Sequence, residues 1–260
     1  MPEPTVAFTF AEGIARVTLA RPAVRNAFNA DVIAELHAAF TRIAAADDVR
    51  AVVLAGEGNV FCGGADINWM RESLDLTFEA NAIDAERMSD MFRAIDNCPR
   101  PVIARIQGAA LGGGAGLAAA CDIAIAADDA VFGFTEVKLG IIPAVISPFV
   151  LAKIGASHAR ALFLTGERFG ADRAAQIGLV HHVVPAAELD AAVETCIGEF
   201  RTAGPYAVSA AKLLVRRVLD ATYEETRAIT TRAIADQRIS PEGQEGLRAF
   251  LERRKANFHA

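Results

Sequence analysis

Apolar and polar positions follow two different periods along this chain, and these periods predict an alternation of strands and helices. Val6 to Ala20 contains two alternating runs on either side of Glu12-Gly13, a pattern typical of a β-hairpin. Residues 29–43 carry apolar side chains at helical spacing, and Asn29 is placed to cap that helix. Three short, continuously apolar runs predict buried strands at residues 49–55, 101–106 and 123–127. Strands that alternate with helices indicate an α/β fold with several parallel strands.

The last part of the chain has a different pattern. Gly204-Pro205 marks a boundary, and the residues that follow read as a run of helices. We therefore expect a core over residues 1–203 and a C-terminal helical region over residues 204–260. Lys212 lies on a basic face of this region, where long charged side chains are most often solvated.

Composition and charge limit the classes of function. The chain has 260 residues, 53% of them hydrophobic and 22% charged, which suffices for one large domain. A net charge of −6 argues against a nucleic-acid surface, no apolar run approaches the length of a membrane span, and the first four residues lack signal-peptide features. Four cysteines without paired spacing favour free thiols, and no His/Cys cluster suggests a metal site. We therefore expect a cytoplasmic protein with no nucleic-acid, membrane or metal partner.

The strongest chemical signal lies between Arg105 and Pro143. A buried strand is followed by three consecutive glycines, Gly112 to Gly114, and then by a segment of small residues. The start of a helix there would present free N–H groups and a partial positive charge, which suit an anion or an oxygen that becomes negative during a reaction. Glu136 follows in the mostly apolar stretch 132–138, where burial would raise its pKa toward the working range of an acid or base.

Two other interpretations fit these glycines when they are taken alone. Gly114-x-Gly116-x-x-Ala119 matches the loose form of the dinucleotide-binding fingerprint, but this pattern recurs by chance in Ala/Gly-rich sequence and no clear acidic residue ends a following strand. The second is a closely packed helix that requires small residues. The sequence around the glycines has to separate these alternatives.

Residues 58–67 form a second unit of strand, glycines and helix. Together with the motifs at 112–122, 132–140 and 164–166, in this order, it resembles the enoyl-CoA hydratase/isomerase family, the crotonases. The resemblance extends from roughly Phe8 to Phe258. It implies a spiral of ββα units with a C-terminal helical region, a homotrimer or dimer of trimers, and an acyl-CoA substrate. No separate cofactor is implied, because coenzyme A is part of the substrate.

The resemblance also implies roles for individual residues. The backbone N–H groups of Ala65 and Gly113 would donate to the thioester oxygen, and Glu136 would act as the acid or base at C2. The positions implied to contact coenzyme A are Arg25, Gly64, Ala65, Asp66, Ile67 and Gly113. Asp66 is also placed to cap the helix that begins near Ile67, and Lys212 or a near neighbour is a further contact for coenzyme phosphates. A bulkier residue at Gly113 is expected to impair turnover far more than folding.

The chain departs from the family pattern at two places. Gly116 stands where hydratases with two catalytic carboxylates usually have Glu, and residues 144–150 are apolar where many members are glycine-rich, which should reshape the acyl pocket. With one carboxylate left, three outcomes are open: hydration, double-bond isomerisation, or acyl-CoA binding without chemistry.

We favour hydration because both departures together resemble the bacterial methylglutaconyl-CoA hydratase subgroup. That subgroup implies a branched, carboxylated 2-enoyl-CoA such as 3-methylglutaconyl-CoA, an intermediate of leucine degradation. A neighbouring subgroup that acts on longer isoprenoid glutaconyl-CoA esters has similar features, and the sequence does not separate the two.

Overall fold

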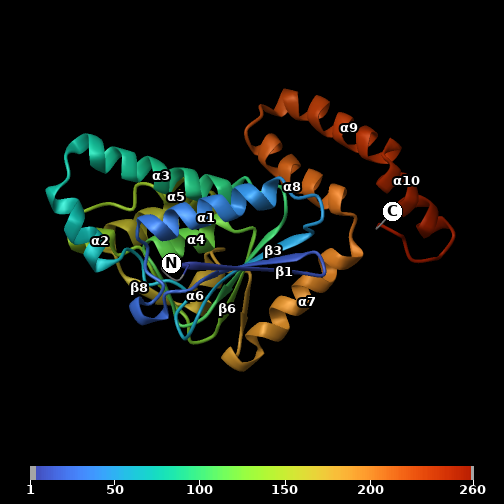
Figure 1. Cartoon of the computed structure of the whole chain (residues 1–260). Helices are drawn as coiled ribbons and strands as arrows, with labels where there is room; N and C mark the ends of the chain where they lie inside the picture. Colours follow the sequence, from blue (N-terminus) through green and yellow to red (C-terminus); the bar gives the residue numbers. More distant parts are fainter. Residues whose placement is uncertain (1–3, 259–260) are drawn as a thin grey trace.

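A six-stranded sheet forms the centre of the structure, which is a computed structural model that describes residues 4–258 (Figure 1). In spatial order its strands are β1 (Val6–Ala11), β2 (Ile14–Leu19), β3 (Ala51–Gly56), β4 (Val102–Ile106), β6 (Ile123–Ala127) and β9 (His182–Val184). β1 and β2 form the predicted antiparallel hairpin, and the pairs from β2 to β9 are all parallel. Residues 1–3, which belong to the stretch considered for a signal peptide, and residues 259–260, the end of the predicted helical region, lie outside the described residues.

A second, smaller sheet alternates with the first along the chain. Its strands are β5 (Ala109–Leu111), β7 (Val131–Gly133) and β8 (Arg168–Gly170). β4 of the large sheet is followed by β5 of the small sheet and then by helix α4 (Gly113–Ala120). β6 and β7 repeat this order and lead through the 3-10 helix η3 (Glu136–Leu139) to α5 (Ser147–Thr165). This repeated strand–strand–helix unit confirms the predicted α/β class and its spiral of ββα units.

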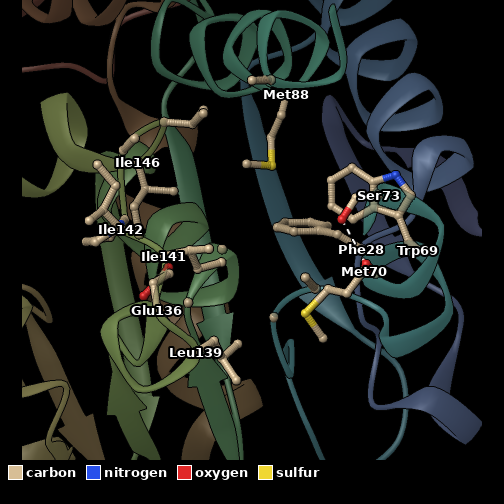
Figure 2. Close-up of a pocket in the computed structure, with 18 of the residues that line it drawn as sticks. Phe28, Trp69, Met70, Ser73, Met88, Glu136, Leu139, Ile141, Ile142 and Ile146 are labelled. Carbon is tan, nitrogen blue, oxygen red and sulfur yellow. Dashed lines mark hydrogen bonds between the residues drawn. The ribbon is translucent and has the colours of Figure 1, made fainter. Parts of the chain in front are cut away.

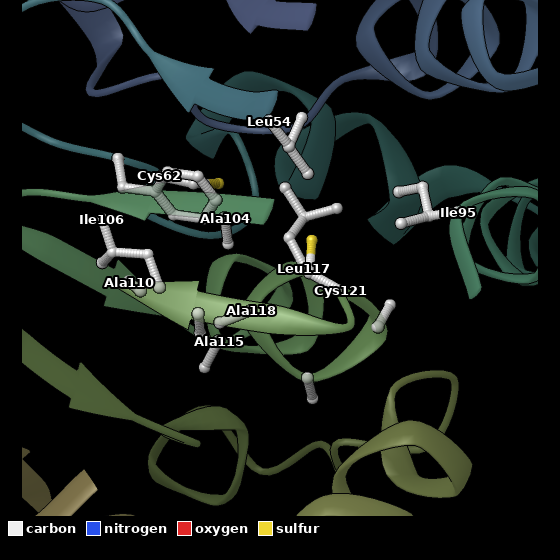
Figure 3. Close-up of a cluster of buried hydrophobic side chains, with 14 of the residues drawn as sticks. Leu54, Cys62, Ile95, Ala104, Ile106, Ala110, Ala115, Leu117, Ala118 and Cys121 are labelled. Atoms are coloured by element: carbon white, nitrogen blue, oxygen red, sulfur yellow. The ribbon is translucent and has the colours of Figure 1, made fainter. Parts of the chain in front are cut away.

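Both faces of the large sheet are buried, as expected for parallel strands with continuously apolar sequences. In β3, Val52 and Leu54 belong to the main core, whereas Val53 belongs to a second cluster on the opposite face. The main core includes buried side chains of α1 (Ala30–Ala44), α3 (Phe78–Asp96) and α4, part of which is shown in Figure 3. The second cluster is completed by α7 (Leu189–Thr202), through residues such as Val193.

Two predicted helix starts are confirmed at atomic detail. The Asn29 side chain accepts a hydrogen bond of 3.0 Å from Val32 N, and this caps α1. The Asp66 side chain accepts one of 2.8 Å from Asn68 N, which caps α2 (Ile67–Glu72). The remaining short elements are η1 (Pro22–Val24), η2 (Ser73–Asp75), α6 (Ala171–Gln176) and η4 (Ala186–Glu188).

Three helices form the C-terminal region and extend beside the sheet as an arm (Figure 1). They are α8 (Pro205–Leu219), α9 (Tyr223–Ile239) and α10 (Pro241–Leu251). Lys212 in α8 points back to the core, where its Nζ lies 2.6 Å from Asp122 Oδ2 and the side chain is only 17% exposed. The expectation of a solvated Lys212 is therefore wrong. Within residues 4–258, no helix is long and apolar enough to cross a membrane.

Candidate active site

Backbone hydrogen bonds hold the two glycine turns side by side. Cys62 N donates to Ala109 O and Leu111 N donates to Cys62 O, both at 3.0 Å, so the first turn adds a bridge to the edge of β5. An ideal Cβ on Gly114 would lie 2.4 Å from Cys62 O, and one on Gly64 would lie 3.1 Å from Leu111 O. The close approach of the two backbones requires glycine at position 114, and the φ of 100° at Gly64 also favours glycine there.

In the first turn, the N–H of Ala65 points away from the neighbouring segment around Phe28. Phe28 N donates to Gly64 O at 2.7 Å, and Asp66 N donates to Phe28 O at 2.8 Å. This is a parallel bridge between Phe28 and Ala65, in which the N–H of Ala65 points to the other side. No residue in the described part of the chain accepts a hydrogen bond from the Ala65 N–H, so this group is available to a ligand.

The second turn leads directly into α4. Gly112 adopts φ 51° and ψ −118°, a conformation suited to glycine, and donates to Gly133 O at 2.8 Å. α4 begins at Gly113, and the first hydrogen bond of the helix runs from Gly116 N to Gly112 O. The N–H of Gly113 therefore has no partner inside the helix, and it lies at the positive end of the helix dipole.

Both turns open into one cavity of about 350 Å³ (Figure 2). Gly64, Ala65, Gly113 and Glu136, which the sequence predicts as site residues, all line it. The other lining residues are mostly apolar: Phe28, Gly63, Trp69, Met70, Ser73, Asn81, Asp84, Ala85, Met88, Gly112, Thr135, Leu139, Ile141, Ile142, Pro143, Ala144, Val145 and Ile146. The arrangement brings two N–H donors and one carboxylic acid together in a largely apolar space.

Glu136 is the chemically most unusual side chain of the cavity. Burial raises its pKa above the ordinary range of a glutamate, and a hydrogen bond from its own backbone N–H opposes this only in part. Its Oε2 atom is buried and has no hydrogen-bond partner among residues 4–258, while Oε1 would lie 3.2 Å from a Cβ on Gly112. A carboxyl group with a raised pKa and an unused oxygen atom is suited to donate or accept a proton.

The space beside Gly116 is occupied. A Cβ on Gly116 would lie 2.4 Å from Ile146 Cγ2 and 3.2 Å from Phe92 Cε1. Ile146 is buried and also lines the cavity. The apolar stretch predicted to reshape the pocket therefore does so in part by filling the place that a longer residue 116 would need.

Three predicted contact residues do not line this cavity. Arg25 is exposed, and what it contributes to the turn is its backbone oxygen, which accepts from Gly63 N at 2.8 Å. Asp66 is 6% exposed, and its side chain is engaged by Asn68 N and by Arg21, whose Nη2 lies 2.7 Å away. Ile67 is 70% exposed at the start of α2.

The wall opposite Glu136 was not predicted. Phe28, Trp69 and Met70 lie across the cavity from Glu136 (Figure 2). Met88 of α3 points into the space between these two walls. The loosely periodic sequence of residues 75–95 predicts helices at the rim of the site, but nothing in that pattern shows which side chains turn inward.

Phe28 also bears on the expectation for Gly113. A Cβ on Gly113 would lie 2.3 Å from Phe28 Cε2 and 2.6 Å from Cδ2. Phe28 is 1% exposed and packs edge-on against Phe92, with ring centroids 6.2 Å apart. A bulky residue at position 113 would displace this core aromatic ring, so we expect it to lower stability as well as turnover.

Comparisons with known proteins agree with this geometry. The sequence model of the family "Enoyl-CoA hydratase/isomerase" matches residues 9–260. A crotonyl-CoA hydratase of Syntrophomonas wolfei is 35% identical over 249 residues, which is 95% of each protein. Among solved structures, an enoyl-CoA hydratase of Shewanella pealeana superposes with a TM-score of 0.93 at 37% identity, over 97% of this chain and 95% of that one. AtuE of Pseudomonas aeruginosa superposes with a TM-score of 0.95 at 35% identity, over 98% and 100% of the two chains.

Proposed function

This chain belongs to the enoyl-CoA hydratase/isomerase family, and we propose that it adds water to the double bond of a 2-enoyl-CoA thioester. The observation that carries this proposal is the convergence of three groups on one apolar cavity: the N–H groups of Ala65 and Gly113, and the carboxyl group of Glu136. In the proposal, two donors polarise the thioester carbonyl, and one titratable group handles the proton. Coenzyme A enters as part of the substrate.

The proposed reaction proceeds through an enolate. The thioester oxygen accepts hydrogen bonds from Ala65 N–H and Gly113 N–H, and each such donor typically contributes about 3 kcal/mol to transition-state stabilisation. Water attacks C3, the π electrons of the double bond move toward the thioester, and Glu136 takes a proton from the water. The same carboxyl group then returns a proton to C2, which restores the thioester. The carboxyl group of Glu136, which lines the cavity, is the proposed contact of the water.

A branched, carboxylated acyl group such as 3-methylglutaconyl is the substrate that we propose from the sequence pattern at residues 116 and 144–150. It requires a cation for its distal carboxylate, and the described cavity lining contains no Lys, Arg or His. One proposed source of this cation is Arg87 of α3. Its Nη1 lies 3.4 Å from Oδ1 of the lining residue Asp84, and its side chain is 68% exposed. The other proposed source is a neighbouring subunit of a homotrimer or dimer of trimers.

Double-bond isomerisation is the second candidate. It is favoured by the packing of Ile146 against Gly116, which leaves no space for a second carboxylate there. A single Glu136 would then move a proton between C4 and C2 and add no oxygen to carbon. Binding of acyl-CoA without chemistry is the third outcome.

One experiment separates these candidates. The purified protein is incubated with 3-methylglutaconyl-CoA and with unbranched and branched enoyl-CoA esters in H₂¹⁸O, in parallel with D₂O, and the products are analysed by mass spectrometry. We expect ¹⁸O at C3 and deuterium at C2. A shifted double bond without ¹⁸O on carbon would favour the isomerase, and binding of the ester without any product would favour the binding protein.

A further inference from the structure

A buried polar network lies behind the first glycine turn. Asn26 is 1% exposed, and its Nδ2 donates to Glu57 O at 2.9 Å and to Val60 O at 2.7 Å. Its Oδ1 accepts from Arg21 N at 2.9 Å. Both donor hydrogens and the acceptor of this amide are therefore used on backbone groups, which fixes the loop of residues 21–28 against the segment that precedes the turn.

The side chain of Arg21 connects this loop to the turn itself. Nη1 donates to Ala27 O at 2.6 Å, and Nη2 donates to Asp66 Oδ2 at 2.7 Å. The side chains of Arg21 and Asp66 are 20% and 7% exposed. One guanidinium thus holds Ala27 and Asp66, which are the chain neighbours of the two bridge residues Phe28 and Ala65.

The loop backbone requires such support. Arg25 and Asn26 adopt φ of 57° and 53°, two consecutive left-handed residues, neither of which is glycine. L-residues rarely adopt this conformation, although asparagine tolerates it better than most. The reversal that they produce places Phe28 alongside Ala65. There the Phe28 N–H donates to Gly64 O, and Phe28 O accepts from Asp66 N.

We infer that Arg21 and Asn26 are positioning residues for the oxyanion-binding N–H of Ala65. Their hydrogen bonds set the place of the loop, the loop sets the place of Phe28, and Phe28 sets the direction of the Ala65 N–H. This inference rests on the proposed function, because it requires that the N–H meets a thioester oxygen. A small displacement of a catalytic group can reduce turnover by about 100-fold, so an indirect contact of this kind has a measurable effect.

The test compares Arg21→Met with Arg21→Lys and Asn26→Gly. Met keeps the aliphatic stem and removes both hydrogen bonds, Lys retains one charged donor, and Gly accepts the left-handed backbone without its side-chain bonds. We expect Arg21→Met and Asn26→Gly to lower kcat by about 10- to 100-fold with KM changed less than kcat, and Arg21→Lys to recover part of the loss.

A spectroscopic measurement separates positioning from a purely structural role. A cinnamoyl-type CoA thioester absorbs at longer wavelength when its carbonyl is polarised. The absorption spectrum of this thioester is recorded while it is bound to protein that carries Glu136→Gln, a change that prevents reaction. We expect the red shift of the bound thioester to decrease in Arg21→Met. Arg216→Met is the matched control: it removes the ion pair between Arg216 of α8 and Asp96 at the end of α3, which involves no residue of the loop or the turn. That control should lose thermal stability and keep the red shift.

The outcomes distinguish the two levels of the proposal. A folded Arg21→Met protein with the full red shift and unchanged kcat would overturn the positioning role and leave the proposed function intact. Absence of any red shift in the protein with Arg21 present, together with absence of hydration, would overturn the proposed function and this inference with it. If Asn26→Gly does not fold, the two Arg21 variants decide the question.

Discussion

Ile146 fills the space next to Gly116: a Cβ on the glycine would lie 2.4 Å from Ile146 Cγ2. The two residues are thirty positions apart by number, one in the buried helix α4 and the other just before α5. Because of this fit, the structure has no room for a carboxylate side chain at position 116. The fit also implies that a larger residue at position 116 requires a smaller one at position 146.

The first prediction follows from this contact. Gly116→Glu should lower the free energy of unfolding by about 3 kcal/mol or more, because overpacking adds to the burial of an unpaired carboxyl group. Gly116→Glu combined with Ile146→Gly should recover part of that loss in urea denaturation. Gly198→Glu is the control, since nothing lies within 4 Å of a Cβ at Gly198 in α7. Full stability of Gly116→Glu alone would contradict the packing described.

Much of the fold is readable from local sequence, because local chemistry decides it. The hairpin, the Asn29 cap of α1 and the Asp66 cap of α2 depend on residues within a few positions of one another. The same holds for the glycine turns, where Gly112 reports a backbone that only glycine adopts easily. The convergence of the two turns was available through resemblance to the family and not through any local pattern.

The unpredicted features are contacts between distant segments. Phe28 lies against Gly113, and the Asn26 amide is used by Val60 and Glu57; neither pairing leaves a periodic trace in the sequence. Lys212 shows the same limit, because a basic helical face reads as solvated until its acidic partner, Asp122, is placed beside it. The roles of Ala65, Gly113 and Glu136 stay predictions that the next experiments address.

The second prediction concerns Gly113. Gly113→Ala should lower kcat and also lower the free energy of unfolding by about 1–3 kcal/mol, because the new methyl group meets the ring of Phe28. Thermal unfolding and steady-state kinetics are measured on the same preparations. Gly113→Ala combined with Phe28→Leu should regain stability, since the smaller side chain leaves room for the methyl group. A stable Gly113→Ala protein without the second change would show that the ring yields easily.

The third prediction concerns Glu136 and pH. Because the folded-state pKa of Glu136 lies above its ordinary value of 4.5, the folded chain binds more protons than the unfolded chain between these two values. The contribution of Glu136 to stability is therefore fully present below pH 4.5 and is lost as pH rises through the raised pKa. Relative to the original protein, Glu136→Gln should gain stability as pH rises through this window and then level off.

The same variant should lose catalysis. Glu136→Gln keeps the size of the side chain but cannot transfer the proton, so kcat should fall by about 10²–10⁴-fold with a smaller change in KM.

The pH dependence of stability is measured by urea denaturation at several pH values for both proteins, and only the difference between their free energies of unfolding is interpreted. A difference that does not depend on pH would mean that Glu136 is not perturbed by burial, and full activity would remove it from the mechanism.

The last prediction concerns the attachment of the C-terminal arm. Lys212 Nζ lies 2.6 Å from Asp122 Oδ2 and 3.2 Å from Arg100 O, and the same Asp122 oxygen accepts from Val102 N at 2.7 Å. Lys212→Met keeps the aliphatic stem and removes the charge, which leaves Asp122 without its cation near the start of β4. Hydrogen bonds to charged groups contribute about 1.5–3 kcal/mol, so the free energy of unfolding should fall by about 2 kcal/mol.

This variant also decides what Lys212 does. If the lysine serves the fold, KM for an acyl-CoA ester should stay within about twofold while the melting temperature falls by about 2–4 °C for each kcal/mol lost. Arg217→Ala, at an exposed position of the same helix, is the matched control and should change neither quantity. An increase in KM by tenfold without a loss of stability would instead assign Lys212 to the coenzyme phosphates, and would require the ion pair with Asp122 to open when substrate binds.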